Sequence, residues 1–338
     1  MRILVLGGTG FIGRHVVERL IASPHTIGSF HRGRTHSSAG VAELWGDRDR
    51  SLDVQEALRQ FRPDTVVDMI LSTETQAQGL VEACRGSVAR LVVISSADVY
   101  RHYDGLRGKS AVPPDPTPLG ETAPLRETRF PYRGHGLAFD HADGYDKILV
   151  EQAVSVPDLP STILRLPAVY GPGDHENRRI QSYLKRMADG RPCILLAEEQ
   201  ASWRWTRGYV ENVAAAIALA ATDSRAVGHT YNVGEEPTLT EREWVERIGD
   251  AFGWQGKVVT VPAAELPEPL RRPFDWRYHL ETDTTRMRKE LGYVEPVAAE
   301  DAMLRTVQWE KARLDEMAPP DYGPEDEFLS RSERLSGR

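Results

Sequence analysis

Short apolar runs alternate with amphipathic stretches through the first half of the chain. This alternation predicts strands over Ile3–Leu6, Thr26–Phe30, Thr65–Ile70 and Leu91–Ser95 and helices over Phe11–Ala22, Leu52–Arg59 and Gln76–Ala83. Strands separated by helices of this length form a parallel sheet with helices on both faces, and right-handed crossovers give it a doubly wound topology. The first half of the chain therefore predicts a doubly wound α/β fold.

The alternation is lost between Arg101 and Asp143, where Pro, Gly and Arg are frequent. A segment this long without regular structure is usually functional, and we expect it to cover the ends of the strands. Regular structure resumes with a helix over Tyr145–Ala153 and a strand over Thr162–Leu166. We expect a larger domain from residues 1–170 with about 205–225, a smaller interleaved α/β substrate domain from 171–204 and 226–318, and a charged, flexible tail from 319–338.

Composition narrows the class of protein. The 338 residues are 27% charged, and their formal net charge of −8 argues against a protein held mainly on nucleic-acid phosphates. Cys84 and Cys193, the two cysteines, indicate neither a disulfide framework nor a thiolate zinc site, and the histidines lack metal-binding spacing. The longest apolar stretch, Val213–Ala221, is well short of the ~20 residues that cross a bilayer. We therefore expect a cytoplasmic protein without a metal, a membrane segment or a nucleic-acid partner.

A glycine-rich turn lies between the first expected strand and the first expected helix. It reads Gly7-Gly8-Thr9-Gly10-Phe11-Ile12-Gly13. The spacing Gly-x-Gly-x-x-Gly lets the backbone turn tightly, approach a pyrophosphate at the helix N-terminus and pack the helix closely on the strand. The same glycines elsewhere would be a plain turn. Their position between a strand and a helix predicts a dinucleotide site and a Rossmann-type sheet.

The end of the second expected strand bears on which dinucleotide binds. NAD-binding proteins of this type usually carry an acid there to hold the ribose 2′-hydroxyl, but this chain has His31, followed by Arg32 and Arg34. A guanidinium pairs with a 2′-phosphate, so the pattern favours NADP(H) over NAD(H), unless these arginines belong to a solvated turn. Asp47 and Arg48, after the next strand, are further candidates for the cofactor site, with Asp47 either accepting the adenine amino group or capping a turn.

Four further segments resemble the extended short-chain dehydrogenase/reductase family, the NAD(P)-dependent epimerase/dehydratase group. They are Val92–Tyr100 with Ser-Ser-x-x-Val-Tyr, Leu164–Gly173 with Arg-x-Pro-x-x-Tyr-Gly-Pro-Gly, Tyr209–Ala214, and Tyr231–Gly234, expected to open the smaller domain. The resemblance implies that Ser96 hydrogen-bonds the reacting substrate oxygen and that Pro167 lies at the cofactor. It also implies that Lys147 holds the nicotinamide ribose and lowers the pKa of a catalytic tyrosine. A homodimer is expected from the resemblance alone.

The chain departs from this family at the catalytic tyrosine, which usually stands four residues before the lysine. That position is Asp143, and the nearest tyrosine, Tyr145, precedes Lys147 by only two residues. On a regular helix, Tyr145 would point to nearly the opposite face. Either the helix begins late and Tyr145 reaches the site from the preceding turn, or Asp143 acts as a carboxylate base, or the chemistry is lost. Tyr100 and Tyr170 are possible substitutes, although packing is the simpler reading of both.

Many relatives in this family act on nucleotide sugars and hold the diphosphate with basic residues. Candidates for substrate binding here are Arg133, Arg179, Arg204 and Arg207. The sequence predicts an NAD(P)-dependent oxidoreductase or epimerase/dehydratase that transfers hydride to or from a carbinol or carbonyl carbon. The rival hypothesis is a non-catalytic NADP-binding sensor or RNA-associated protein with a degenerate site.

Overall fold

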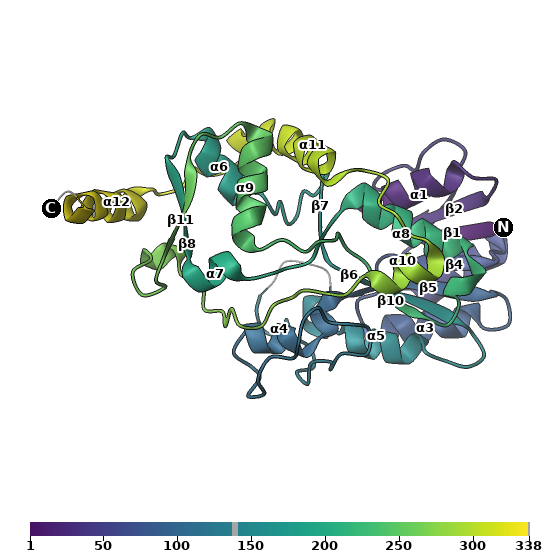
Figure 1. Ribbon diagram of the computed structural model, residues 1–338. Coiled ribbons are helices and arrows are strands. Elements are labelled where there is room, and N and C mark those ends of the chain that lie inside the picture. Colours follow the sequence, from purple (N-terminus) through teal and green to yellow (C-terminus); the bar gives the residue numbers. More distant parts are fainter. Residues whose placement is uncertain (137–140, 337–338) are drawn as a thin grey trace.

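A seven-stranded sheet forms the centre of the larger part of the molecule (Figure 1). The computed structural model describes residues 1–136 and 141–336. The strand order is β10-β6-β5-β4-β1-β2-β3, and all neighbouring pairs are parallel. The strands are β1 (Arg2–Leu6), β2 (Thr26–His31), β3 (Ala42–Trp45), β4 (Thr65–Asp68), β5 (Arg90–Ser96), β6 (Ser161–Leu166) and β10 (Thr230–Asn232). The predicted doubly wound α/β fold is confirmed.

Helices cover both faces of this sheet. One face carries α1 (Gly13–Ile21) and α8 (Val210–Thr222), and the other carries α2 (Ser51–Phe61), α3 (Glu74–Cys84) and α5 (Lys147–Val154). Alternate residues of β1 enter different cores, since Ile3 and Val5 pack with α1 and α8 while Leu4 and Leu6 pack with α2 and α3. A central strand that is apolar on both faces reads as a continuous apolar run, as the sequence suggested.

A smaller part of the molecule lies beyond the carboxyl ends of these strands (Figure 1). It contains the parallel pair β8 (Cys193–Ala197) and β11 (Lys257–Val261), with α6 (Gln181–Ala188), α7 (Glu198–Ser202), α9 (Glu241–Phe252) and α11 (Ala299–Lys311). The pair β7 (Ala168–Tyr170) and β9 (Arg207–Tyr209) joins the two parts. Helix α10 (Thr285–Leu291) returns to pack near β10.

Three segments differ from the sequence-based expectation. Residues 230–232 are an edge strand of the central sheet, paired with β6, and not the opening strand of the smaller domain. Within the stretch expected to be irregular, residues 101–106 form α4 (Arg101–Leu106). The C-terminal segment, expected to be flexible, contains α12 (Gly323–Ser336). Ion pairs and apolar packing hold this helix: Glu325 pairs with Arg186 at 2.6 Å, Asp326 pairs with Arg191, and Phe328 is buried in an apolar cluster with β8.

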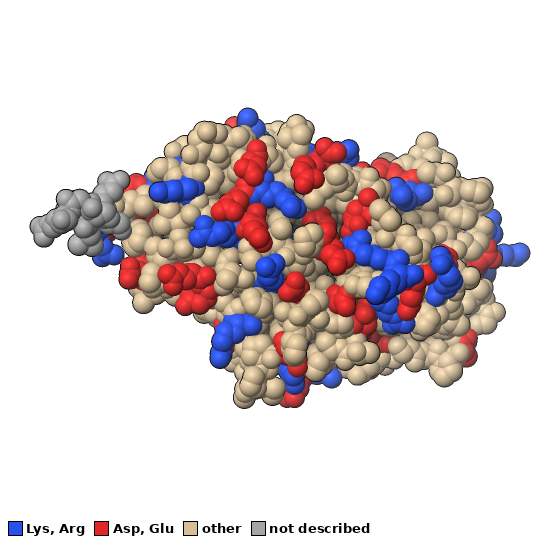
Figure 2. Space-filling view, in the orientation of Figure 1, with Lys and Arg blue, Asp and Glu red and all other residues tan. Residues whose placement is uncertain are grey.

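Acidic and basic side chains are interspersed over most of the face shown in Figure 2, and basic side chains gather over the region of α10. Ion pairs one helical turn apart include Arg242–Glu246 on α9 and Arg286–Glu290 on α10. Within residues 1–136 and 141–336, no helix is both long and apolar enough to cross a membrane. The same residues hold no group of three or more His, Cys, Asp or Glu side chains arranged for a metal ion.

Candidate active site

The glycine loop between β1 and α1 forms a cradle that side chains would fill. A Cβ atom on Gly13 would lie 2.1 Å from the Gly7 carbonyl oxygen, and one on Gly8 would lie 2.6 Å from Ser29 Oγ. Gly7 has a φ of +81°, which favours glycine. Gly10 is exposed at the tip, while Phe11 and Ile12 pack on the core beside α1. This bare backbone at a helix N-terminus fits a dinucleotide pyrophosphate.

Two arginines follow the end of β2. Arg32 and Arg34 are exposed there. His31 occupies the position of the usual acid; it is buried, and its Nδ1 accepts from the Gly33 amide at 3.1 Å. Burial lowers the pKa of His31, with Glu43 on the neighbouring strand opposing that shift. The terminus of β2 thus carries a neutral imidazole and two guanidinium groups.

The two candidates after β3 have structural partners. The Asp47 carboxylate accepts a hydrogen bond from the Asp49 amide at 3.0 Å, so that it caps the turn after β3. Arg48 forms an ion pair with the fully buried Asp68 at the end of β4. The pair joins the β3 turn to the centre of the sheet, so the guanidinium of Arg48 has a structural role whether or not it meets a cofactor.

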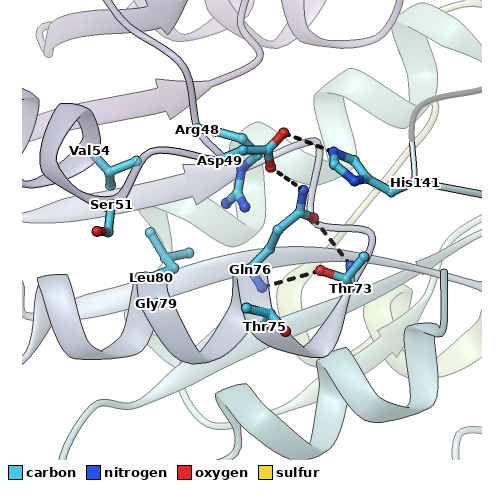
Figure 3. A pocket seen from close by; sticks show the side chains of 10 residues that line it. All are labelled: Arg48, Asp49, Ser51, Val54, Thr73, Thr75, Gln76, Gly79, Leu80 and His141. Atoms are coloured by element: carbon cyan, nitrogen blue, oxygen red, sulfur yellow. Dashed lines mark hydrogen bonds and ion pairs between the residues drawn. The ribbon is translucent and has the colours of Figure 1, made fainter. Parts of the chain in front are cut away.

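A cavity of about 460 Å³ opens beside this turn, between the N-terminal ends of α2 and α3 (Figure 3). Its lining residues are Arg48, Asp49, Ser51, Val54, Thr73, Thr75, Gln76, Gly79, Leu80 and His141. The Asp49 carboxylate accepts from Gln76 Nε2 at 2.7 Å and pairs with His141 Nε2 at 2.9 Å (Figure 3). His141 therefore ties the segment before α5 to the turn after β3.

Helix α5 begins late, at Lys147, because Asp146 caps it. The Asp146 carboxylate accepts from the amides of Ile148 and Leu149 and forms a fully buried ion pair with Arg126 at 2.9 Å. Tyr145 and Asp146 both have extended backbone angles. Tyr145 consequently lies before the helix and reaches the site from there. This is the geometry of the alternative in which the helix begins late.

The catalytic candidates converge at the carboxyl end of β5. Ser96 ends this strand and hydrogen-bonds the side chain of Tyr145. Lys147 Nζ donates to the carbonyls of Leu71 and Ile94, and it lies 5.7 Å from the centre of the Tyr145 ring. Burial lowers the pKa of Lys147 to about 8, although Asp98 and Asp68 oppose the shift. Ser96, Tyr145 and Lys147 thus form one cluster.

Asp143 does not join this cluster. Its carboxylate is exposed and accepts from the Gly134 amide at 2.8 Å, while its carbonyl accepts from Arg133 Nε. The structure therefore corrects the proposal of Asp143 as a base beside Lys147. Tyr100 and Tyr170 also point elsewhere, since their hydroxyls donate to Asn232 and Glu235 respectively.

The sequence analysis missed Asp98, which lies at the centre of the cluster. Asp98 is 8% exposed, and its Oδ2 accepts from the Tyr145 hydroxyl at 2.7 Å and from the Tyr132 hydroxyl at 3.3 Å. Burial raises the pKa of Asp98, and Arg126 opposes that shift. The pKa of Tyr145 is raised well above its usual value by burial and then by Asp98, although the bond with Ser96 acts in the other direction. An acid two residues after Ser96, inside the Ser-Ser-x-x-Val-Tyr segment, was the available signal.

Of the four arginines predicted to bind substrate, Arg179 interacts electrostatically with Tyr132 and Tyr103. Its Nε donates to the Val169 carbonyl at 2.8 Å, and burial lowers its pKa. The other three bind within the protein: Arg207 pairs with Glu241, Arg204 donates to the Thr238 carbonyl, and Arg133 lies over the Phe130 ring at 3.8 Å.

The comparisons with known proteins agree with this geometry. The model of the NAD dependent epimerase/dehydratase family matches residues 3–234. The 2′-dehydrokanamycin reductase of Streptomyces kanamyceticus is 28% identical over 310 residues, which cover 88% of this chain and 79% of that protein. The dTDP-glucose 4,6-dehydratase of Streptomyces niveus is 26% identical over 344 residues, covering 91% and 92%.

Solved structures share the fold over most of their length. The UDP-glucose 4-epimerase of Thermotoga maritima, solved with UDP-glucose, has a TM-score of 0.68 at 19% identity, covering 93% of this chain and all of that one. The Thermus thermophilus UDP-glucose 4-epimerase, solved with NAD, has a TM-score of 0.65 at 24% identity, covering 92% and 99%. Since the family match covers more than half of the chain, the chain belongs to the NAD dependent epimerase/dehydratase family and is an enzyme of that family.

Proposed function

We propose that this enzyme is an NADP(H)-preferring reductase of a sugar carbonyl. The observation that carries the proposal is Tyr145, whose hydroxyl lies between Ser96 and the carboxylate of Asp98. Since its pKa is raised, the phenol is neutral near pH 7 and can donate a proton to a carbonyl oxygen. Reduction needs such a proton donor, whereas oxidation of a carbinol begins with a proton acceptor.

In this proposal the glycine loop holds the pyrophosphate, Arg32 and Arg34 hold the 2′-phosphate, and Lys147 lies near the ribose. When bound, the reduced nicotinamide supplies the hydride. Ser96 orients the substrate oxygen, and Tyr145 donates the proton to it. Arg179, on the smaller part of the molecule, offers positive charge to the substrate from the opposite side.

Two facts favour a reductase over a non-catalytic sensor or RNA-associated protein. The described relatives are named as a reductase, dehydratases and epimerases. The Ser96, Tyr145 and Lys147 side chains also remain together in one cluster despite the altered spacing. The choice of reduction over epimerisation or dehydration rests on the neutral Tyr145 alone.

The test measures cofactor binding and turnover separately. Purified protein should quench or shift NADPH fluorescence with a lower Kd than for NADH, and a panel of nucleotide-linked and free keto-sugars should give one oxidised cofactor per product. Lys147→Met should abolish turnover, while Lys289→Met, an exposed lysine on α10, should not. Product formation without net cofactor oxidation would replace the reductase by an epimerase or dehydratase, and failure to bind either cofactor would reject the proposal.

Cytoplasmic location and a homodimer are part of the same proposal. The expectation of a dimer comes from the family resemblance, and light scattering on the purified protein at micromolar concentration tests it. A monomeric mass that still supports turnover would remove the dimer from the proposal and leave the chemistry intact.

A further inference from the structure

Asp98 joins two tyrosine hydroxyls at one carboxylate oxygen. Tyr145, from the turn before α5, and Tyr132, from the segment that precedes it, both donate to Oδ2. The other oxygen, Oδ1, is buried and has no hydrogen-bond partner among the residues that the structure describes. A buried carboxylate oxygen without a donor costs free energy, so its retention beside the candidate proton donor calls for a functional account.

A third tyrosine extends this contact away from the cluster. The hydroxyl of Tyr103, on α4, lies 2.6 Å from that of Tyr132. Three hydrogen bonds therefore connect Tyr145, Asp98, Tyr132 and Tyr103 in one continuous line. Arg107 lies over the rings of Tyr103 and Tyr132, at 4.3 and 5.3 Å, and both Tyr103 and Arg107 are partly exposed at the outer end of the line.

Charged groups face Asp98 from each element around it. Arg126 donates to the Asp98 carbonyl at 3.0 Å and contributes positive charge, and Lys147 does so from α5. Tyr132 and Tyr145 are the neutral donors, and Arg179 acts on Tyr132 from the smaller part of the molecule. Burial disfavours the ionised carboxyl while these cations favour it, so Asp98 can both take up and release a proton.

We propose that Asp98 is a positioning residue that aims the Tyr145 hydroxyl and replaces its proton, and that Tyr132 and Tyr103 continue this path toward solvent. The proposal rests on the proposed function. In the reduction, the O–H bond of Tyr145 breaks as an O–H bond forms on the substrate oxygen, and NADPH supplies the hydride as co-reactant. The Asp98 carboxylate then accepts a proton from Tyr132 and passes it to the Tyr145 phenolate, while Tyr103 and then solvent return a proton to Tyr132, so that Asp98 ends ionised and each turnover consumes one solvent proton.

The first experiment does not depend on turnover. Tyrosinate absorbance at 295 nm is titrated in four proteins: wild type, Asp98→Asn, Tyr145→Phe and the double variant Asp98→Asn/Tyr145→Phe. The titration curve of Tyr145 is the difference between wild type and Tyr145→Phe, and in the absence of the Asp98 carboxylate it is the difference between Asp98→Asn and the double variant. Without the neighbouring carboxylate, Tyr145 should ionise at a pH lower by about one unit or more, because a negative charge at this distance disfavours a second one. Circular dichroism in the same titration confirms that each protein is folded. An unchanged titration of Tyr145 would overturn the proposal.

The second experiment measures steady-state reduction against pH. Asp98→Asn should lower kcat by roughly 100-fold, within the usual range of general acid–base effects, with little change in KM and a loss of the pH dependence that Asp98 contributes. Asp98→Glu, which restores a carboxylate, should recover part of kcat. Tyr132→Phe, which breaks the line without removing Asp98, should lower kcat less than Asp98→Asn does.

Tyr231→Phe is the matched control, because Tyr231 also donates to a carboxylate, Glu290, but on the far edge of the sheet. It should leave kcat unchanged. Equal losses in Tyr231→Phe and Tyr132→Phe, or wild-type kcat and pH dependence in Asp98→Asn, would overturn the proposal. If wild-type protein reduces no sugar carbonyl, the proposed function fails, and the absorbance titration still decides whether Asp98 controls Tyr145.

Discussion

Replacement of Asp146 by alanine tests the packing that holds the candidate active site together. Asp146 and Arg126 are both fully buried, and two hydrogen bonds at 2.9 and 3.2 Å join them. The same carboxylate caps α5 and accepts from the Phe130 amide at 2.8 Å. Asp146→Ala therefore removes the partner of a buried cation and the cap of the helix that carries Lys147.

The expected loss follows from these contacts. Removal of one partner of a buried ion pair typically costs about 3–5 kcal/mol, because the remaining charge is buried without compensation. The loss of an N-cap costs about 1 kcal/mol, although the two effects overlap in one side chain. A melting temperature lower by roughly 4 °C or more follows, because an unfolding entropy of about 2.1 cal/mol/K per residue gives about 1.4 °C per kcal/mol for 338 residues.

Scanning calorimetry and urea denaturation measure this loss against a matched control. Asp158→Ala breaks the ion pair with Arg85, whose side chains are about half exposed, and should change stability little, because water screens an exposed pair. Asp146→Asn, which keeps an oxygen for the cap, should fall between the two. If Asp146→Ala melted within a degree of Asp158→Ala, the buried pair would not hold the start of α5 in place.

The stability difference between wild type and Asp146→Ala should depend on pH, and the pKa of Asp146 sets the direction of that dependence. Burial opposes ionisation of Asp146, but hydrogen bonds from Arg126 and the Phe130 amide outweigh it and lower the pKa of the carboxyl. A carboxyl whose pKa is lower in the folded state stabilises the protein above its unfolded pKa, and this contribution is lost as the pH falls through the folded value. The stability difference between wild type and Asp146→Ala should therefore be full above about pH 4 and shrink below it.

Three further predictions concern the cofactor site. Gly13→Ala places a methyl group 2.1 Å from the Gly7 carbonyl oxygen and should raise the Kd for NADPH at least tenfold in a fluorescence titration; an unchanged Kd would mean that the loop does not hold the pyrophosphate. Joint replacement of Arg32 and Arg34 by serine should weaken NADPH binding by about 1–3 kcal/mol while leaving NADH binding unchanged, and equal loss for both would remove the case for a 2′-phosphate site. His141→Ala breaks the 2.9 Å pair with Asp49 and should raise the Kd for NADPH a few-fold, whereas the same change at exposed His135 should not.

The sheet and the glycine loop were predictable because their signals are local. Apolar runs of strand length, each followed by an amphipathic helix, specify a parallel sheet irrespective of what packs around it. The edge strand at residues 230–232 was misplaced because its partner, β6, lies some sixty-five residues earlier, and three residues carry no periodicity. Likewise, α12 is held by ion pairs with Arg186 and Arg191 and by the burial of Phe328, which a charged C-terminal sequence alone does not reveal.

The site was predictable only where a family pattern fixed the positions. Ser96 and Lys147 follow from such patterns, whereas Asp98 depends on which hydroxyls reach it in three dimensions. One of those hydroxyls belongs to Tyr132, which in turn contacts the hydroxyl of Tyr103, and both tyrosines lie in a stretch where the sequence shows no regular alternation. The contacts that define the candidate proton path are thus long-range, and no local spacing encodes them.

The altered tyrosine spacing has a simple geometric explanation. Four residues of α-helix advance about 6 Å, at about 1.5 Å per residue. Two residues of extended chain advance about 6.6 Å, at about 3.3 Å per residue. Tyr145 and Asp146 are extended, and α5 begins at Lys147. Two extended residues therefore separate Tyr145 from Lys147 along the chain by about the same distance as four helical residues would. The late cap at Asp146 and the short spacing therefore belong together: a substitution that extended α5 backwards through Tyr145 would turn its hydroxyl away from Asp98, even though every residue of the cluster was still present.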